Sequence, residues 1–233
     1  MRELLRGIAA ADVALSYDGR LFLADFGGGW SVNTNASIQV LAAKDPALQA
    51  KGRAVAALIA KGFQETAPEE LARLLSHPDQ RVRREAQFEI VNRGDRGLLE
   101  SNAAKNEARA ARLHALWGLG QLKAVDALLK LTADTDLEIR ANAARTLGDL
   151  RAKETRAALL GLLRDDSPRL RALAAVALGR LCEKGDTEAI DALYTANVSP
   201  VDVVLRHAVL SALDRISTEA AATARSTAPD REQ

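Results

Sequence analysis

Apolar residues along most of this chain recur with the spacing that one buried face of an α-helix requires. Five segments share the pattern around an arginine: an apolar residue lies just before it, and others lie three and seven residues after it. These positions form an i, i+4, i+8 stripe, which is typical of a helix that buries one side. The five arginines, spaced 29, 28, 31 and 35 residues apart, are Arg83, Arg112, Arg140, Arg171 and Arg206.

Residues that favour helix starts precede four of these five helices. A side-chain oxygen at such a place can accept a hydrogen bond from an otherwise unpaired backbone N–H. The four, each standing four residues before its arginine, are Asp79, Asp136, Ser167 and Asp202. Ala108 takes this place in the second repeat and offers no cap. Further apolar helical stretches precede the caps, at residues 68–75, 124–131, 155–163 and 188–194.

The repeated unit of helix, short turn and helix predicts a mainly α fold, an α-solenoid of stacked hairpins. Glycine stands eight positions after the arginine in three repeats, at Gly120, Gly148 and Gly179, where it would let neighbouring helices approach closely. A turn aspartate followed by (V/I/L)-R-x-x-A resembles the HEAT repeat, in its short form shared with phycobilisome-lyase-like repeats. The resemblance covers residues 67–217 and implies an armadillo-like helical scaffold. A non-repetitive helical bundle is the alternative.

The first residues follow a different pattern, that of short β-strands. Residues 13–29 are interpreted as strand, turn at Asp18–Gly19, strand and glycine turn. A third strand is expected over Ser37–Ala42. Residues 1–43 are therefore expected to form a small β-segment with exposed strand edges.

A linker of residues 44–66 is expected between this β-segment and the repeats. Asp45–Pro46 is a typical helix start, and Gly62 is a typical stop, so the helix should cover residues 46–61. A polar tail of residues 218–233 follows the last repeat.

The phrase DGRLFLADFGGGW, at residues 18–30, resembles the last blade of a β-propeller. Together with the repeats up to about residue 120, it resembles a family of PVC-type haem-binding proteins and membrane-bound dehydrogenases. Members join a sorbosone-dehydrogenase-like propeller to HEAT repeats and a cytochrome c domain, which implies a bacterial cell envelope or periplasm. The chain departs from that family because most of the propeller and the C-x-x-C-H haem motif are missing. The resemblance thus implies a truncated protein or a fragment.

Composition narrows the classes of partner. A net charge of +1 argues against a large nucleic-acid surface, and no apolar run approaches the length that membrane insertion needs. The single cysteine excludes an internal disulfide and a thiolate metal cluster. Glu3 and Asp12 interrupt the start, so we do not interpret it as a signal peptide.

We expect no catalytic, cofactor-binding or metal-binding residues, no cofactor and no small-molecule substrate. His77 lies in a turn, where it should assist capping, and Cys182 ends an apolar helix as a structural thiol. The FGGGW run lacks the lysine and helix start of a P-loop, so it is interpreted as a tight turn. Asp18 and Asp25 could pair as carboxylates, but Asp18 belongs to the strand turn.

The surface most informative about a binding partner is that of the second helix in each repeat, because this helix lines the concave side of HEAT solenoids. Positions two, five, six and nine residues after the arginine face away from the buried stripe. His114 and Trp117 lie one turn apart and could meet the same ligand. Trp117 is either an interface anchor or the filling of a gap beside Gly118 and Gly120. The expected partner-binding residues are Glu85, Phe88, Glu89, Asn92, His114, Trp117, Gln121, Asn142, Arg145, Asp149 and Arg180.

These observations predict a non-enzymatic scaffold that binds a protein or a neighbouring domain, since mixed charges on this surface suit a protein better than a nucleic acid. The alternative is a fragment of a propeller–HEAT–cytochrome c dehydrogenase-like protein whose catalytic and haem domains lie outside these residues. A third hypothesis is a tetrapyrrole-handling repeat of the lyase type.

The helical repeats should fold without the β-segment, because their apolar stripes run without interruption from Leu71 to Ile216. Residues 64–218 alone should give a helical circular dichroism spectrum and a cooperative thermal transition. A disordered spectrum for this piece, alongside a folded full-length chain, would contradict the prediction.

Overall fold

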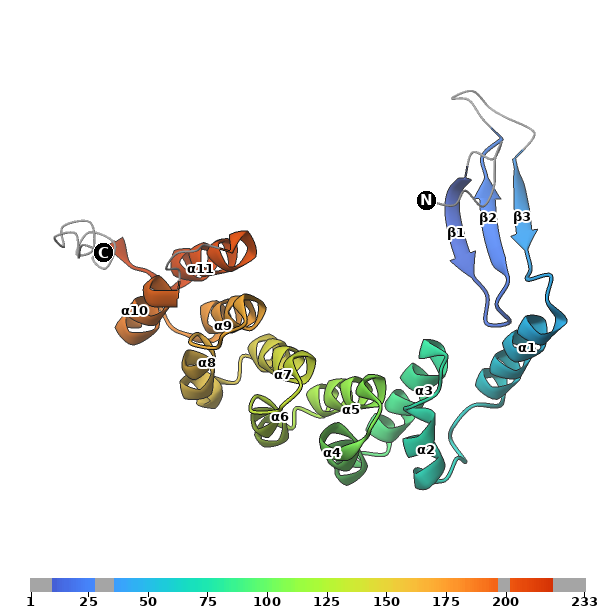
Figure 1. Ribbon diagram of the computed structural model, residues 1–233, viewed down its shortest axis with the longest axis horizontal. Helices are drawn as coiled ribbons and strands as arrows, with labels where there is room; N and C mark the ends of the chain where they lie inside the picture. Colours follow the sequence, from blue (N-terminus) through green and yellow to red (C-terminus); the bar gives the residue numbers. More distant parts are fainter. Residues whose placement is uncertain (1–9, 28–35, 197–201, 220–233) are drawn as a thin grey trace. The chain divides into compact units, whose positions relative to one another are not determined.

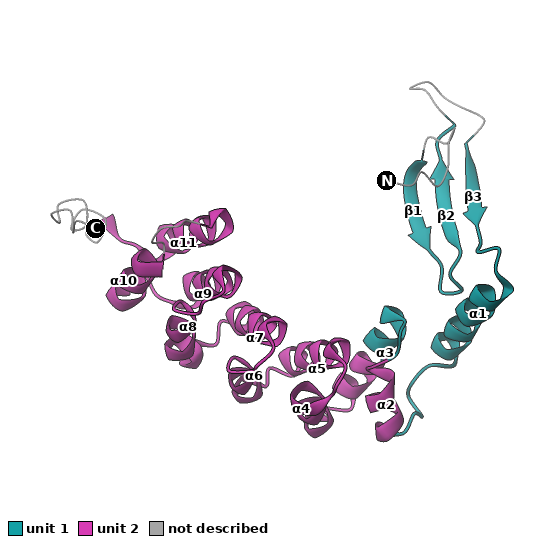
Figure 2. Ribbon diagram, in the orientation of Figure 1, with its two compact units in different colours: residues 1–67, 77–85 teal, residues 68–76, 86–233 magenta. Residues whose placement is uncertain are grey.

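The computed structural model describes residues 10–27, 36–196 and 202–219. This described part is mainly helical, with three strands near the N-terminus, as the sequence predicts (Figure 1). The chain forms two compact units (Figure 2). Unit 1 contains residues 1–67 and 77–85, and unit 2 contains residues 68–76 and 86–233.

Unit 1 contains a three-stranded antiparallel sheet in the order β1-β2-β3. Its strands are β1 (Ala10–Leu15), β2 (Leu21–Asp25) and β3 (Ser37–Leu41). The turn between β1 and β2 falls at Asp18–Gly19, as predicted, and Gly19 has the positive φ of 84° that such a turn requires. The glycine turn predicted from FGGGW lies mostly outside the described residues; of its glycines the structure describes Gly27.

Both faces of this sheet carry apolar side chains. The register places Ala14, Phe22 and Val40 side by side on one face, and Val13 and Leu23 on the other. Val13 and Val40 are exposed, and so are Leu15 and Ile38. Within unit 1 the strands therefore leave apolar surface open on both faces.

The linker helix confirms its predicted boundaries. Helix α1 (Pro46–Lys61) begins after Asp45, whose carboxylate accepts a hydrogen bond from the N–H of Ala47 at 2.8 Å. It ends at Gly62, which has a positive φ of 77°. Gly52 lies against the β1–β2 turn, where an added Cβ would stand 2.0 Å from the carbonyl oxygen of Asp18. Glycine at this position is therefore what allows α1 and the turn to meet.

Unit 2 is a stack of helical hairpins in two layers. The helices are α2 (Pro68–Leu74), α3 (Gln80–Asn92), α4 (Arg96–Lys105), α5 (Arg109–Gln121), α6 (Val125–Leu131), α7 (Leu137–Leu150), the short 3-10 helix η1 (Lys153–Thr155), α8 (Arg156–Leu162), α9 (Pro168–Leu181), α10 (Thr187–Ala196) and α11 (Val203–Ile216). Figure 2 shows the second helices of the hairpins, α5, α7, α9 and α11, on one side and the first helices on the other. Helix α4 was not among the predicted stretches, although Asp95 caps it by accepting a hydrogen bond from Leu98 N–H. Helix α3 begins in the part of the chain assigned to unit 1.

The predicted caps are present. Asp136 and Asp202 accept hydrogen bonds from the N–H groups of the first turns of α7 and α11, at 2.8 and 2.9 Å. Ser167 does the same for α9 at 3.4 Å, and Asp79 accepts from Arg81 N–H at 2.8 Å. Ala108 makes no side-chain cap for α5. The local sequence therefore specifies where these helices start.

The repeat arginine has a structural role that the periodic pattern did not reveal. Arg140 Nη1 donates to the carbonyl oxygens of Asp134 and Thr135, at 2.9 and 3.2 Å. Arg171 makes the equivalent bonds to Asp165 and Asp166 at 2.9 and 3.2 Å. In both repeats the guanidinium folds back over the turn that precedes its own helix, and so ties the two helices of one hairpin together.

The same turns connect consecutive repeats. Arg112 forms an ion pair with Asp134 in the next turn, and Arg140 reaches Asp165 at 3.5 Å. In the other layer Arg156 donates to Asp186 at 2.7 and 2.6 Å, and this bonding lowers the pKa of the Asp186 carboxyl to about 2. Charged pairs about one repeat apart therefore join neighbouring hairpins, in addition to the apolar contacts of the core.

The predicted stripe forms the core, and the predicted glycines bring the second helices close together. Ala143, Ala174 and Leu178 are fully buried. A Cβ on Gly148 would lie 2.6 Å from Ala177 Cβ, and one on Gly179 would lie 2.8 Å from Ala212 Cα. Helices α7, α9 and α11 therefore pack at a separation that only glycine permits at these points.

Replacing Gly148 with alanine should lower the free energy of unfolding by about 1–3 kcal/mol, because the methyl group overpacks the α7–α9 contact. Gly161→Ala is the matched control, since an added Cβ there meets nothing within 4 Å in helix α8. That control should be neutral or stabilising by up to about 1 kcal/mol, because alanine favours the helix. Urea denaturation of both variants measures the difference; equal effects would contradict the packing.

Candidate functional site

Three rows of side chains on the second helices face away from the buried stripe, two, five and nine residues after the repeat arginine. Because helical positions i, i+3 and i+7 share a face, each helix contributes one residue to each row. The middle row begins with two exposed aromatic residues, Phe88 at 39 % and Trp117 at 37 %. It consists of Phe88, Trp117, Arg145, Val176 and Ser211.

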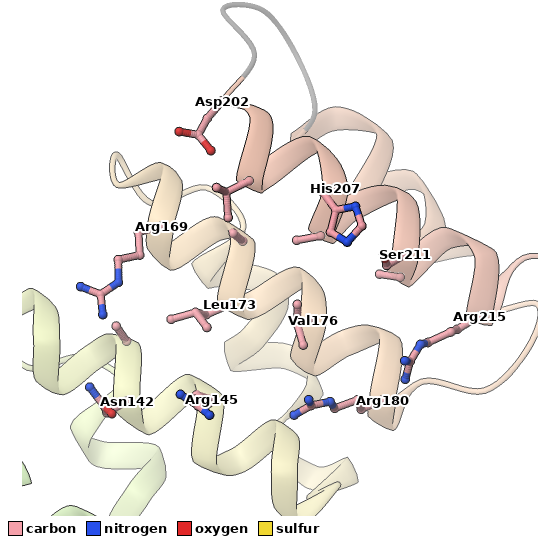
Figure 3. A pocket seen from close by; sticks show the side chains of 15 residues that line it. Asn142, Arg145, Arg169, Leu173, Val176, Arg180, Asp202, His207, Ser211 and Arg215 are labelled. Atoms are coloured by element: carbon pink, nitrogen blue, oxygen red, sulfur yellow. The ribbon is translucent and has the colours of Figure 1, made fainter. Parts of the chain in front are cut away.

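Toward the C-terminal end of unit 2 these rows enclose a groove of about 590 Å³ between α7, α9 and α11. Leu173 and Val176 of α9 lie at its centre (Figure 3). Ala172 and Ala208 are buried beside them, so the floor of the groove is apolar. A volume of this size admits a few side chains of a ligand but not a folded domain.

The border of the groove is basic. Figure 3 shows Arg145 of α7, Arg180 of α9 and Arg215 of α11 along one side of the groove, and Arg169 near the start of α9. The one acidic residue in the lining is Asp202, which caps α11. The groove therefore combines an apolar floor with an excess of positive charge.

Carboxylates next to the groove hold some of these arginines in place. Asp149 forms ion pairs with Arg180 and, at 3.9 Å, with Arg145. Glu138 pairs with Arg169. Among the described residues Arg215 makes no ion pair, so its guanidinium is the one most available to a ligand.

Trp117 is held by contacts on two sides. Its indole N–H donates to Asn142 Oδ1 at 3.2 Å, and its ring meets His114 edge-on, with ring centroids 5.0 Å apart. Asn142 also lines the groove, and its amide nitrogen donates to the carbonyl oxygen of Glu138 at 2.8 Å. The same side chain therefore supports Trp117 and borders the groove.

His114 is not a surface residue, which corrects the expectation that it could meet a ligand together with Trp117. Only 4 % of His114 is exposed, and its Nδ1 lies 2.8 Å from Gln87 Oε1. Gln87 Nε2 in turn donates to Gln121 Oε1 at 3.1 Å. His114 thus belongs to a polar network between α3 and α5, and its ring contacts Trp117.

The other expected residues fall into two groups. Asn142, Arg145 and Arg180 line the groove, and Asp149 pairs with two of its arginines. The residues expected on helix α3 do not line it. They are Glu85, Phe88, Glu89 and Asn92, of which Glu89 pairs with Arg93 at 2.8 Å and Glu85 with Arg84 at 3.2 Å.

Several groove residues were missed by the sequence reasoning. Leu173, Val176 and Ser211 occupy the same repeat positions as Asn142, Trp117 and Arg145, but charged, amide and aromatic side chains were favoured as partner contacts. Arg215 lies nine residues after its repeat arginine, as Arg180 does. Applying the same offsets to the last two repeats, whatever the residue type, would have found them.

The side chains considered for chemistry have structural roles. His77 Nδ1 accepts a hydrogen bond from Asp79 N–H at 3.0 Å, so it does assist capping. Asp18 and Asp25 accept from the turn N–H groups of Arg20 and Gly27, at 3.2 and 2.9 Å. Over the described ranges, the structure contains no group of three His, Cys, Asp or Glu side chains arranged to hold a metal ion.

None of the helices in the described segments has the length and apolar character needed to span a membrane.

The hairpin stack defines the chain as an α-solenoid of the armadillo and HEAT type. The protein-family model for HEAT repeats matches residues 96–179 and 125–214, which together cover more than half of the chain. The chain therefore belongs to the HEAT-repeat family. A comparison with curated protein sequences finds no significant match.

Solved structures share this fold at low identity. The complex of CpcE and CpcF of phycocyanin lyase from Nostoc sp. PCC7120 matches with a TM-score of 0.52 and 19 % identity, over 63 % of this chain and 97 % of that one. A designed armadillo repeat protein in complex with the peptide (KR)4 matches with a TM-score of 0.49 and 17 % identity, over 74 % and 95 %. An engineered protein gives a TM-score of 0.49 and 19 % identity, over 75 % and 94 %.

Cys182 should be unreactive in the folded protein, because burial and the nearby Asp186 carboxylate raise the pKa of its thiol to about 11. At pH 8 alkylation by iodoacetamide should be roughly a hundredfold slower in the native chain than in the chain unfolded in denaturant, since the thiolate is the nucleophile. Mass spectrometry reports this directly because the chain has one cysteine. Equal alkylation rates in the folded and unfolded states would contradict the raised pKa of the Cys182 thiol.

Proposed function

We propose that the chain is a non-enzymatic scaffold that binds a protein or a neighbouring domain through the second-helix face of unit 2. The observation that carries the proposal is Trp117, an exposed aromatic side chain held by Asn142 and His114. Large aromatic residues fixed in this way are typical anchors of protein interfaces. The face also continues over three more helices, past a groove suited to part of a partner.

The contacts that hold Trp117 should lower the entropic cost of binding, which supports its assignment as an anchor. A free surface tryptophan loses rotamer freedom on binding, whereas one already held by a hydrogen bond and a ring contact loses less. The His114 ring that contacts Trp117 is itself buried and bonded to the buried Gln87, which donates to Gln121, so the contact is held in place. Solenoids present such residues on extended surfaces, which suits them to protein partners.

The solved phycocyanin lyase structure gives limited support for protein binding, because it is itself a complex, of CpcE with CpcF. At its identity to this chain it argues for a shared fold and for no particular partner. The tetrapyrrole-handling hypothesis thus has no observation in this chain that favours it over protein binding.

The alternative, a fragment of a dehydrogenase-like protein, depends on the resemblance of residues 18–30 to a propeller blade. A three-stranded antiparallel sheet with apolar surface on both faces is compatible with that origin and with other small sheets. The reading frames that flank this one in the genome would test it. A propeller or a C-x-x-C-H motif in continuous frame would favour the alternative, in which the repeats act as a rigid spacer.

Replacing Trp117 with alanine should weaken binding to a partner recovered by pull-down by about 2 kcal/mol or more, because a central anchor is lost. Isothermal titration with the purified partner measures this change, and the thermal midpoint of the chain should move little. Tyr194→Ala, which removes an exposed aromatic from α10 in the opposite layer, is the matched control and should leave affinity unchanged.

Unchanged affinity in the Trp117 variant would remove Trp117 from the interface. A large drop in the thermal midpoint would instead show that Trp117 chiefly supports the fold, and the interface would then have to be sought elsewhere on the face.

A further inference from the structure

We infer that the groove between α7, α9 and α11 binds an acidic peptide segment whose apolar side chains pack on Leu173 and Val176 and whose carboxylates meet Arg145, Arg180 and Arg215. The inference rests on the proposed function and adds the chemistry of the partner. The segment would belong to the partner protein, inserted into the groove while the rest of the face contacts the partner body.

The expected apolar contacts with the peptide follow from two side chains of α9 that the core leaves partly exposed. Helix α9 already buries Leu170, Ala174 and Leu178 completely. Leu173 and Val176 lie on another side of the helix and stay partly exposed at the centre of the groove (Figure 3). Covering them with apolar side chains of a ligand would be favourable, since it removes apolar surface from water.

The expected contacts with acidic residues follow from the arginines at the groove border. Its lining contains four arginines and one aspartate, whereas the whole chain has a net charge of only +1. Asp149 is shared between Arg145 and Arg180, so their guanidinium groups keep donors available, and Arg215 has no ion-pair partner among the described residues. Guanidinium groups bind carboxylates with two parallel hydrogen bonds, which favours an acidic ligand.

The geometry also fixes the pattern of the peptide. Arg180 and Arg215 each lie nine residues after their repeat arginine, so they form a basic row across neighbouring helices. Arg145, Val176 and Ser211 form the parallel middle row one helical turn away, with Val176 as its apolar member. A segment lying across the helices would thus place an apolar residue over Val176, beside Leu173, and acidic residues over the flanking arginines.

An apolar floor distinguishes this groove from a phosphate-binding surface. A nucleic-acid backbone would meet the arginines but would leave Leu173 and Val176 without an apolar partner. Phosphate contacts dominate the affinity of nucleic-acid sites, and these sites carry a much larger excess of charge than this chain has. The observations therefore favour a peptide.

Selection of a random-sequence peptide library on the full-length chain tests the inference while the partner itself is still unidentified. Enriched peptides should contain Asp or Glu adjacent to Leu, Ile or Phe. The best of them should bind Arg215→Glu at least about tenfold more weakly, because a like charge then faces its carboxylates. A peptide with Lys in place of its acidic residues should regain affinity for that variant.

Arg164→Glu is the matched control, because Arg164 is an exposed arginine in the turn after α8, away from the groove lining. It changes the net charge equally and should leave peptide affinity within about twofold. Thermal unfolding of both variants confirms that neither change disturbs the fold.

The outcomes separate the two proposals. Enrichment of basic or neutral peptides, or equal effects of the two arginine variants, would overturn the acidic groove while leaving protein binding intact. Equal competition by a single-stranded oligonucleotide of matched charge would overturn the peptide assignment in favour of phosphate binding. If no peptide is enriched, the groove inference fails; if Trp117→Ala also leaves every recovered partner unaffected, the proposed function fails with it.

Discussion

Three of the five repeats depend on one recurring interaction, the guanidinium of the repeat arginine folded onto the carbonyl oxygens of its own turn. Arg83, Arg140 and Arg171 each make two such bonds. One carbonyl oxygen of each pair is partly buried, where losing a hydrogen-bond partner costs stability. The Nε of each of the three is buried without a hydrogen bond, a recurring cost that the two carbonyl bonds offset. The motif thus ties the start of the second helix to the turn that precedes it.

The binding face is a consequence of that regularity. Once each hairpin is fixed and Gly148 and Gly179 set the spacing of α7, α9 and α11, residues at equal offsets line up across helices. The face changes character along this alignment, from Trp117 with its polar support to an apolar groove bordered by arginines. Because each repeat contacts mainly its neighbours, such changes alter the surface without altering the stack. This separation of scaffold and surface is what lets one fold serve many partners.

The β-segment shows which structural features are determined by adjacent residues and which are not. The Asp18–Gly19 turn, the strands around it and the boundaries of α1 were all predictable, because each depends on a few adjacent residues. The contact of Gly52 with the turn was not predictable, because it joins residues far apart in the sequence. Apolar residues on both faces were visible in the sequence, yet the sequence does not say what covers them.

In the repeats, the sequence by itself determined the helices, their caps and the buried stripe, because a period of 3.6 residues and a capping side chain act within one turn. The tertiary structure decided which outward positions are exposed and which residues meet. His114 is buried and forms a hydrogen bond with Gln87 from the preceding repeat. Leu173 and Val176 line a groove because α7 and α11 stand on either side of α9. Arg112 pairs with Asp134 because the next turn lies within its reach. These contacts join repeats about 30 residues apart, so they follow from the way the hairpins stack and not from any local pattern.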